Sequence, residues 1–171
     1  MGMLDWMTGT KAAPKGVARQ PVAALREALL AVNRPTAPFQ VRDGAPEKCD
    51  LVAEWKIVDA AWYEIFAKAG IEKVFKVLMK FDEAKGEVRA VDQEFSVEWR
   101  AGVPVLGASL EAFRGQKWEM STETVYAFKE EDLTFGKIYS YKFATPEIKD
   151  PLREAALKAG WGWRGVAFGK L

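Results

Sequence analysis

The sequence predicts an α+β domain, and three observations support this class. A chain of 171 residues is long enough for one domain to bury its apolar surface without disulfides. Its 49% hydrophobic and 29% charged residues are typical of a globular protein. Apolar residues first recur at the helical period, and from Glu72 onward they recur at the period of a strand. We therefore expect a strongly curved antiparallel sheet of six to eight strands packed against two or three helices, an arrangement that could close into a partial barrel.

The composition of the first twenty residues separates them from the rest of the chain. An apolar start is followed by glycine, proline and basic residues, which predicts a flexible leader over residues 1–20 and a single globular domain over residues 21–171. Leu4, Trp6 and Met7 are unusually apolar for a tail. They could dock back on the domain, contact a protein partner or rest at a membrane interface.

The first part of the domain has helical and strand signals in alternation. Pro21 can open a helix that runs to about Asn33. Strands are expected at 39–42 and 51–57, with a turn at 43–46 between them. Asp59 begins a second predicted helix, which ends at Gly70. The apolar stripes of these helices are Leu25, Ala28, Leu29 and Val32 in the first, and Trp62, Ile65, Phe66 and Ala69 in the second.

The second part of the domain is predicted to be mostly sheet. Residues 75–81 and 91–99 form a long hairpin around a turn at 82–86, and further strands are expected near 109–113, 118–128 and 135–143. We interpret Asp92, Glu94, Ser96 and Glu98 as a solvated face of the hairpin. Asp150 and Pro151 are expected to begin a helix that ends at Gly160, and residues 161–168 are expected to form a last strand.

Composition also excludes several kinds of chemistry. The chain has no histidine and one cysteine, Cys49, so it cannot build a Ser-His-Asp triad, a Cys-His pair or a His-rich metal site. We expect neither a metal nor a cofactor, and we interpret Cys49 as a free thiol in a reducing compartment. A formal charge of +1 makes nucleic acid an unlikely partner. No apolar run is long enough for a transmembrane segment, and the start does not resemble a secretory signal, so we expect a cytoplasmic protein.

One pattern occurs three times: an aromatic residue, then arginine, then glycine directly or one residue later. It places Arg100, Arg114 and Arg164 at expected strand ends. If the three guanidinium groups converge, they would hold a carboxylate or phosphate at the rim of a pocket lined by aromatic residues such as Trp163 and Tyr139. The alternative is that each arginine stacks on an aromatic ring at a strand end and binds no ligand.

Three functions remain open from the sequence. The first is a non-catalytic interaction module or adaptor, recruited to a protein partner or membrane surface through Leu4, Trp6 and Met7. The second is a domain that binds a small amphipathic or anionic ligand through the aromatic residues and rim arginines. The third is an enzyme that uses carboxylates without histidine. Because no carboxylates cluster in a diagnostic pattern, we name no catalytic residue.

Overall fold

The computed structural model describes residues 9–35, 37, 39–56, 62, 66–67, 73–115 and 145–166. Side chains are described throughout these ranges except at 73, 94, 106–115 and 145–147. The elements, in chain order, are α2 (Val22–Leu30), β1 (Phe39–Asp43), the 3₁₀ helix Ala45–Glu47, β2 (Leu51–Trp55), β3 (Lys73–Asp82), β4 (Glu87–Arg100), β5 (Val103–Gly115), α4 (Thr145–Lys158) and β6 (Gly162–Gly165).

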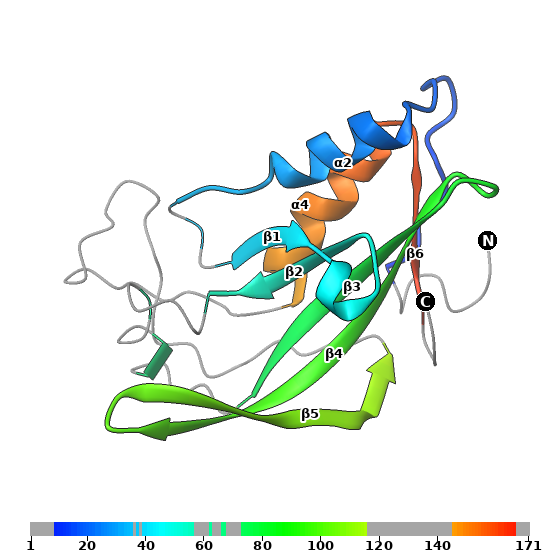
Figure 1. Cartoon of the computed structure of the whole chain (residues 1–171). Helices are drawn as coiled ribbons and strands as arrows, with labels where there is room; N and C mark the ends of the chain where they lie inside the picture. Colours follow the sequence, from blue (N-terminus) through cyan, green and yellow to red (C-terminus); the bar gives the residue numbers. More distant parts are fainter. Residues whose placement is uncertain are drawn as a thin grey trace.

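The described strands form one open sheet, so the class is α+β, as predicted. Strands β1 to β5 follow one another in chain order and each pair is antiparallel. β6 is different, because it pairs with β4 in parallel and makes the sheet mixed rather than purely antiparallel. β3 occupies one edge of β4, so β5 and β6 share the other edge, with β6 beside residues 87–90 and β5 beside residues 92–100. Figure 1 shows β5 and β6 at opposite ends of the long strand β4.

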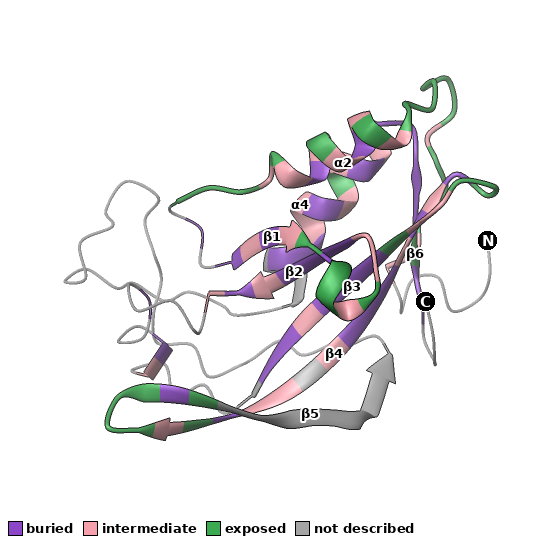
Figure 2. Cartoon of the chain, viewed as in Figure 1, coloured by how far each residue is buried: buried purple, intermediate pink, exposed green. Residues whose placement is uncertain are grey.

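Both helices lie on one side of the sheet and cover its core face (Figure 1). In α2, Leu25 and Leu29 of the predicted stripe are fully buried. They pack in one cluster with Ile148 and Leu152 of α4 and with apolar side chains of β1 to β4. Figure 2 shows that the buried residues of each helix alternate with exposed ones, as an amphipathic helix requires.

The helix α4 begins earlier than the sequence indicates. We expected Asp150 and Pro151 at its first turn, but the helix spans Thr145–Lys158 and Pro151 lies inside it. The Asp150 carboxylate instead accepts a hydrogen bond from Arg153 at 2.8 Å. The predicted end is confirmed: Gly160 has a φ of +77°, and Trp161 donates a backbone hydrogen bond to Ala156. This pairing satisfies a terminal carbonyl group in the manner of a Schellman motif.

The β3–β4 hairpin is confirmed, but one of its faces differs from the prediction. Asp92 was interpreted as part of a solvated face, yet it lies directly opposite Val77 and is 0% exposed. Its carboxylate is 2.6 Å from the Lys149 ammonium group of α4. The pattern of alternation could not reveal this arrangement, because the partner comes from a helix 57 residues later in the chain.

Residues 9–20, part of the segment predicted to be a flexible leader, lie along the domain. Lys11 and Trp163 exchange two backbone hydrogen bonds of 2.8 Å. Further along, Gln20 donates a backbone hydrogen bond to Ala159 and accepts one from the Trp161 indole. These contacts tie the segment to α4 and β6.

Some predicted elements lie outside the described residues. These are the helix expected after Asp59, of which only Trp62, Phe66 and Ala67 are described, and the strands expected at 118–128 and 135–143. Trp62 and Phe66 are buried in the core, as predicted for the helical stripe.

Candidate functional site

The structure places two of the predicted ligand-binding residues on β6, on opposite faces of the sheet. Trp163 is 1% exposed and belongs to the core with the helices, so it is not at the surface of a pocket. Arg164 points to the other face, and its side chain is 45% exposed. Its Nε donates to both carboxylate oxygens of Glu87, at 3.0 and 3.1 Å.

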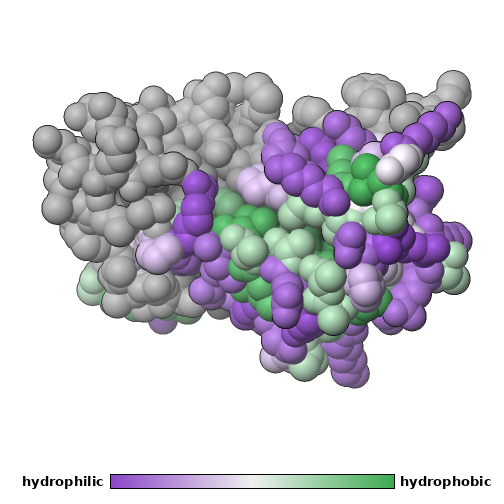
Figure 3. Space-filling model, turned by 90° about the horizontal axis from the view of Figure 1, so that it is seen from above, coloured by the Kyte–Doolittle hydropathy of each residue, from purple (hydrophilic) through white to green (hydrophobic). Residues whose placement is uncertain are grey.

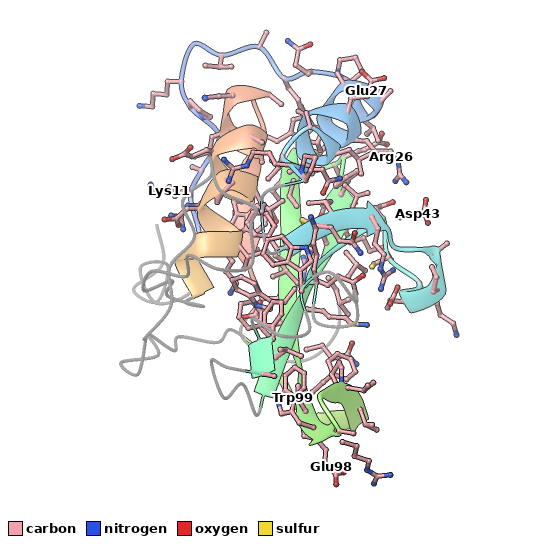
Figure 4. All side chains as sticks on the ribbon, turned by 90° about the vertical axis from the view of Figure 1, so that its left-hand side faces the viewer. Lys11, Arg26, Glu27, Asp43, Glu98 and Trp99 are labelled. Carbon is pink, nitrogen blue, oxygen red and sulfur yellow. The ribbon has the colours of Figure 1, made fainter. Side chains whose placement is uncertain are left out.

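Arg100 lies far from Arg164. Arg164 is in register with Arg89, and Arg100 lies eleven positions further along β4. At about 3.3 Å per residue, the two positions are separated by roughly 36 Å of strand. In Figure 4, Glu98 lies at the lower end of the molecule, well below Lys11, whose backbone pairs with β6. Arg100 itself is exposed, with its nearest carboxylate oxygen 3.3 Å away on Glu98.

Of the other predicted site residues, the structure describes only the backbone of Arg114. The backbone of Arg114 is paired with Gln93 of β4, but its side chain is outside the described residues. Tyr139 and the apolar start, with Leu4, Trp6 and Met7, are outside them as well. Among the arginines that are described, the structure therefore does not bring Arg100 and Arg164 to one rim.

A different set of cations does come together. Lys80 of β3 lies directly opposite Arg89 of β4, and Arg89 lies directly opposite Arg164 of β6. Residues that are paired across neighbouring strands point to the same face of a sheet. Three positively charged side chains therefore form a row across β3, β4 and β6 on the face away from the helices. We call Lys80, Arg89 and Arg164 the cation row.

Like charges in adjacent cross-strand positions destabilise a sheet unless oppositely charged groups lie close by. Arg164 is compensated by Glu87. Among the residues that the structure describes, neither Lys80 nor Arg89 makes an ion pair or a side-chain hydrogen bond, and the buried Nε of Arg89 has no hydrogen-bond partner. The two neighbouring cations therefore have no acceptor among the residues that the structure describes, and Lys80 is exposed to solvent.

An open hollow of about 650 Å³ lies beside these two cations. The hollow forms because β2 is shorter than β3. β2 begins at Leu51, which pairs with Met79, so the edge of β3 beyond Met79 has no neighbouring strand. The residues that line it are Val22, Asp50, Lys80, Phe81, Asp82, Glu83 and Arg89.

Two of the three carboxylates in this hollow are engaged by the backbone. Asp50 accepts a hydrogen bond from the amide of Phe81 at 2.7 Å and so takes the place of the missing strand partner. Asp82 accepts one from the amide of Lys85 at 3.1 Å, which fixes the hairpin turn. Glu83 is exposed to solvent. Three carboxylates thus line the hollow beside the two cations, and the backbone hydrogen bonds hold Asp50 and Asp82 in place without removing their charge.

The other charge cluster on this face has a structural explanation. Arg42 of β1 lies between Glu47 and Glu54, at 2.5 and 2.7 Å, and Lys76 of β3 is 3.5 Å from Glu54. Hydrogen bonds from Arg42 lower the pKa of Glu47. Burial acts to raise the pKa of Glu54, but hydrogen bonds from Arg42 and Gln40 outweigh it, and that pKa is lowered as well. Each charge is matched, so this network joins three strands and offers no open donor.

The cysteine and the carboxylates of the described chain do not cluster as metal ligands do. Burial, the largest effect, raises the pKa of the Cys49 thiol, which disfavours the nucleophilic thiolate. Within the described ranges, no three Cys, Asp or Glu side chains gather closely enough to hold a metal ion.

The described surface shows little that would suit a large apolar interface. Its exposed large hydrophobic side chains are Val17, Val103 and Val105. In the face of the molecule seen from above, hydrophilic residues border the apolar ones (Figure 3). Within the described residues, neither helix has the length and apolar character needed to span a bilayer.

Comparison with protein-family models, with curated proteins and with solved structures finds no match for this chain.

Lys80 and Arg89 were not among the predicted ligand-binding residues, although one signal in the sequence could have paired them. The turn at 82–86 was predicted, and its length sets the register of the hairpin, which places Lys80 opposite Arg89. The addition of Arg164 to the row could not have been found in this way, because β6 pairs with β4 in parallel from 75 residues away.

Proposed function

We propose that this chain is a cytoplasmic, non-catalytic binding module, and that it holds a small anionic ligand in the hollow beside Lys80 and Arg89. The observation that carries the proposal is the pair itself. Two cations are directly opposite each other, and within the described structure neither has a carboxylate partner. An anion between them would offset their repulsion and would accept hydrogen bonds from the planar guanidinium group of Arg89.

The size and lining of the hollow support a small molecule as the ligand. A volume of about 650 Å³ lies within the usual range of ligand sites, about 300–1,000 Å³. Val22 and Phe81 give it apolar wall, so a ligand with an anionic group and an apolar part would be complementary. This agrees with the second function inferred from the sequence, with Arg89 in place of Arg100 at the site.

The interaction module that uses Leu4, Trp6 and Met7 remains a separate proposal. Those residues lie outside the described structure, and the described surface favours the anionic ligand through the cation row. The strong curvature expected of the sheet is likewise a proposal.

The proposal is tested by titrating the untagged protein with inorganic phosphate and with acetate, using isothermal titration calorimetry at low salt. We expect Arg89→Gln to weaken binding about 10- to 100-fold, since a hydrogen bond to a charged group contributes about 1.5–3 kcal/mol. Arg100→Gln is the matched control. It removes the same charge from the far end of β4 and should leave binding unchanged.

Two results would reject the proposal. One is the absence of anion binding by the wild-type protein at millimolar concentrations. The other is an equal loss of affinity in Arg89→Gln and Arg100→Gln, which would mean that only net charge matters. Thermal melting of both variants establishes that each remains folded.

A further inference from the structure

The third cation of the row, Arg164, is held in a way that leaves most of its donors available. Both oxygens of Glu87 accept from its Nε, and its Nη groups make no hydrogen bond to any described residue. The Glu87 side chain is only 12% exposed, so it is a fixed support. Arginine has five N–H donors in a planar fork, and here one of them orients the group while four remain free.

The spacing of the row limits what could use these donors. Neighbouring strands lie about 4.8 Å apart, so the Cα atoms of Arg89 and Arg164 are separated by about that distance and those of Lys80 and Arg164 by about twice as much. A single carboxylate or phosphate between Lys80 and Arg89 would fill the first gap. Arg164 is not among the residues that line the hollow, so its Nη groups would hold a second anionic group outside it, one strand further along the same face.

We propose that the ligand carries two anionic groups a few ångströms apart, the first held by Lys80 and Arg89 and the second by Arg164. This inference rests on the proposed function and specifies its ligand class as a compound with two phosphate or carboxylate groups. Glu87 acts as a positioning residue, because it contacts Arg164 and not the ligand.

The carboxylates near the row are consistent with this assignment. Asp82 and Glu87 are paired across β3 and β4 two positions beyond Lys80 and Arg89, on the same face of the sheet. They limit how far a large polyanion could extend in that direction. The site thus favours a compact ligand with two anionic groups over an extended polyanion.

The experiment compares ligands with one and two anionic groups on four proteins. The ligands are inorganic phosphate against pyrophosphate and acetate against succinate, titrated calorimetrically into wild type, Arg89→Gln, Arg164→Gln and the control Arg100→Gln. We expect Arg164→Gln to bind pyrophosphate or succinate about 10-fold more weakly than wild type and to bind phosphate and acetate normally. Arg89→Gln should weaken binding of all four.

The phosphate and carboxylate arms distinguish the two chemistries, because a selective loss in only one arm would identify that group. The inference is overturned if Arg164→Gln lowers the affinity for one-group and two-group ligands equally. It is also overturned if Arg164→Gln lowers the affinity for no ligand while Arg89→Gln still binds weakly. If Arg89→Gln also behaves as wild type, or wild type binds none of the anions, the proposed function itself fails.

Two variants at Glu87 test its role as a positioning residue. Glu87→Gln keeps an oxygen acceptor for the Nε of Arg164, whereas Glu87→Ala removes it. We expect the amide variant to retain the preference for the two-group ligands and the alanine variant to lose it. If the alanine variant keeps that preference, Glu87 does not position Arg164.

Discussion

Removing the Lys149 side chain should cost the fold far more than removing both members of its ion pair. The Lys149 ammonium group is 2.6 Å from the Asp92 carboxylate, and the two residues are 8% and 0% exposed. Burial, the largest effect, lowers the pKa of Lys149 even though Asp92 acts to raise it. Desolvation thus outweighs attraction, as expected for a pair that is not itself a net source of stability.

The single and double variants should differ in how much unfolding free energy they lose. Lys149→Met leaves a fully buried carboxylate without its cation and should lower the free energy of unfolding by about 3–5 kcal/mol. For a domain of this size, that corresponds to a fall in melting temperature of about 6–20 °C. Asp92→Leu should cost less, because Lys149 can lose its proton more easily than usual. The double variant replaces the pair with apolar side chains of similar size and should lie within about 1 kcal/mol of wild type.

Urea denaturation followed by tryptophan fluorescence measures all four proteins. The reasoning predicts strong non-additivity, with the double variant more stable than Lys149→Met alone. It is refuted if the two single losses add up in the double variant, since that would mean that the residues contribute independently. It is equally refuted if Lys149→Met costs less than about 1 kcal/mol.

Two further predictions concern the edge of the sheet and its response to acid. The pKa values of Glu47 and Glu54 are lowered in the folded protein, so their contribution is complete above the unfolded value of 4.5 and is lost as pH falls through the folded values. Arg42→Met should therefore make urea stability depend less steeply on pH below 4.5, and an unchanged slope would contradict this. The Asn33 side chain exchanges two hydrogen bonds with Val41 at the outer edge of β1, at 2.6 and 2.8 Å. Asn33→Ala should cost about 1 kcal/mol and cause concentration-dependent association by light scattering, whereas a variant that stays monomeric would show that this edge needs no cap.

Local patterns predicted most of the elements that the structure describes. The stripe of α2 with Leu25 and Leu29 and the β3–β4 hairpin depend on neighbours within a few residues, and these were predicted correctly. The start of α4 was not, because proline is tolerated inside the helix at Pro151 and the local signal for a first turn was misleading. Residues 9–20 have little apolar pattern of their own, and their position is set by hydrogen bonds to Trp161 and Trp163 at the other end of the chain.

The candidate site was harder to predict for the same physical reason. An aromatic residue followed by arginine and glycine indicates a strand end, but it does not say which strand lies beside it. Arg100 and Arg164 share the pattern and lie at opposite ends of β4, whereas Arg89 and Arg164 share no pattern and are neighbours. Lys80 could be placed opposite Arg89 from the length of one turn, while Arg164 joins the row only through a parallel pairing that closes a loop of 75 residues. Strand register therefore decides which charged side chains become neighbours in a sheet. The arginine to test first is Arg89, which belongs to no sequence motif.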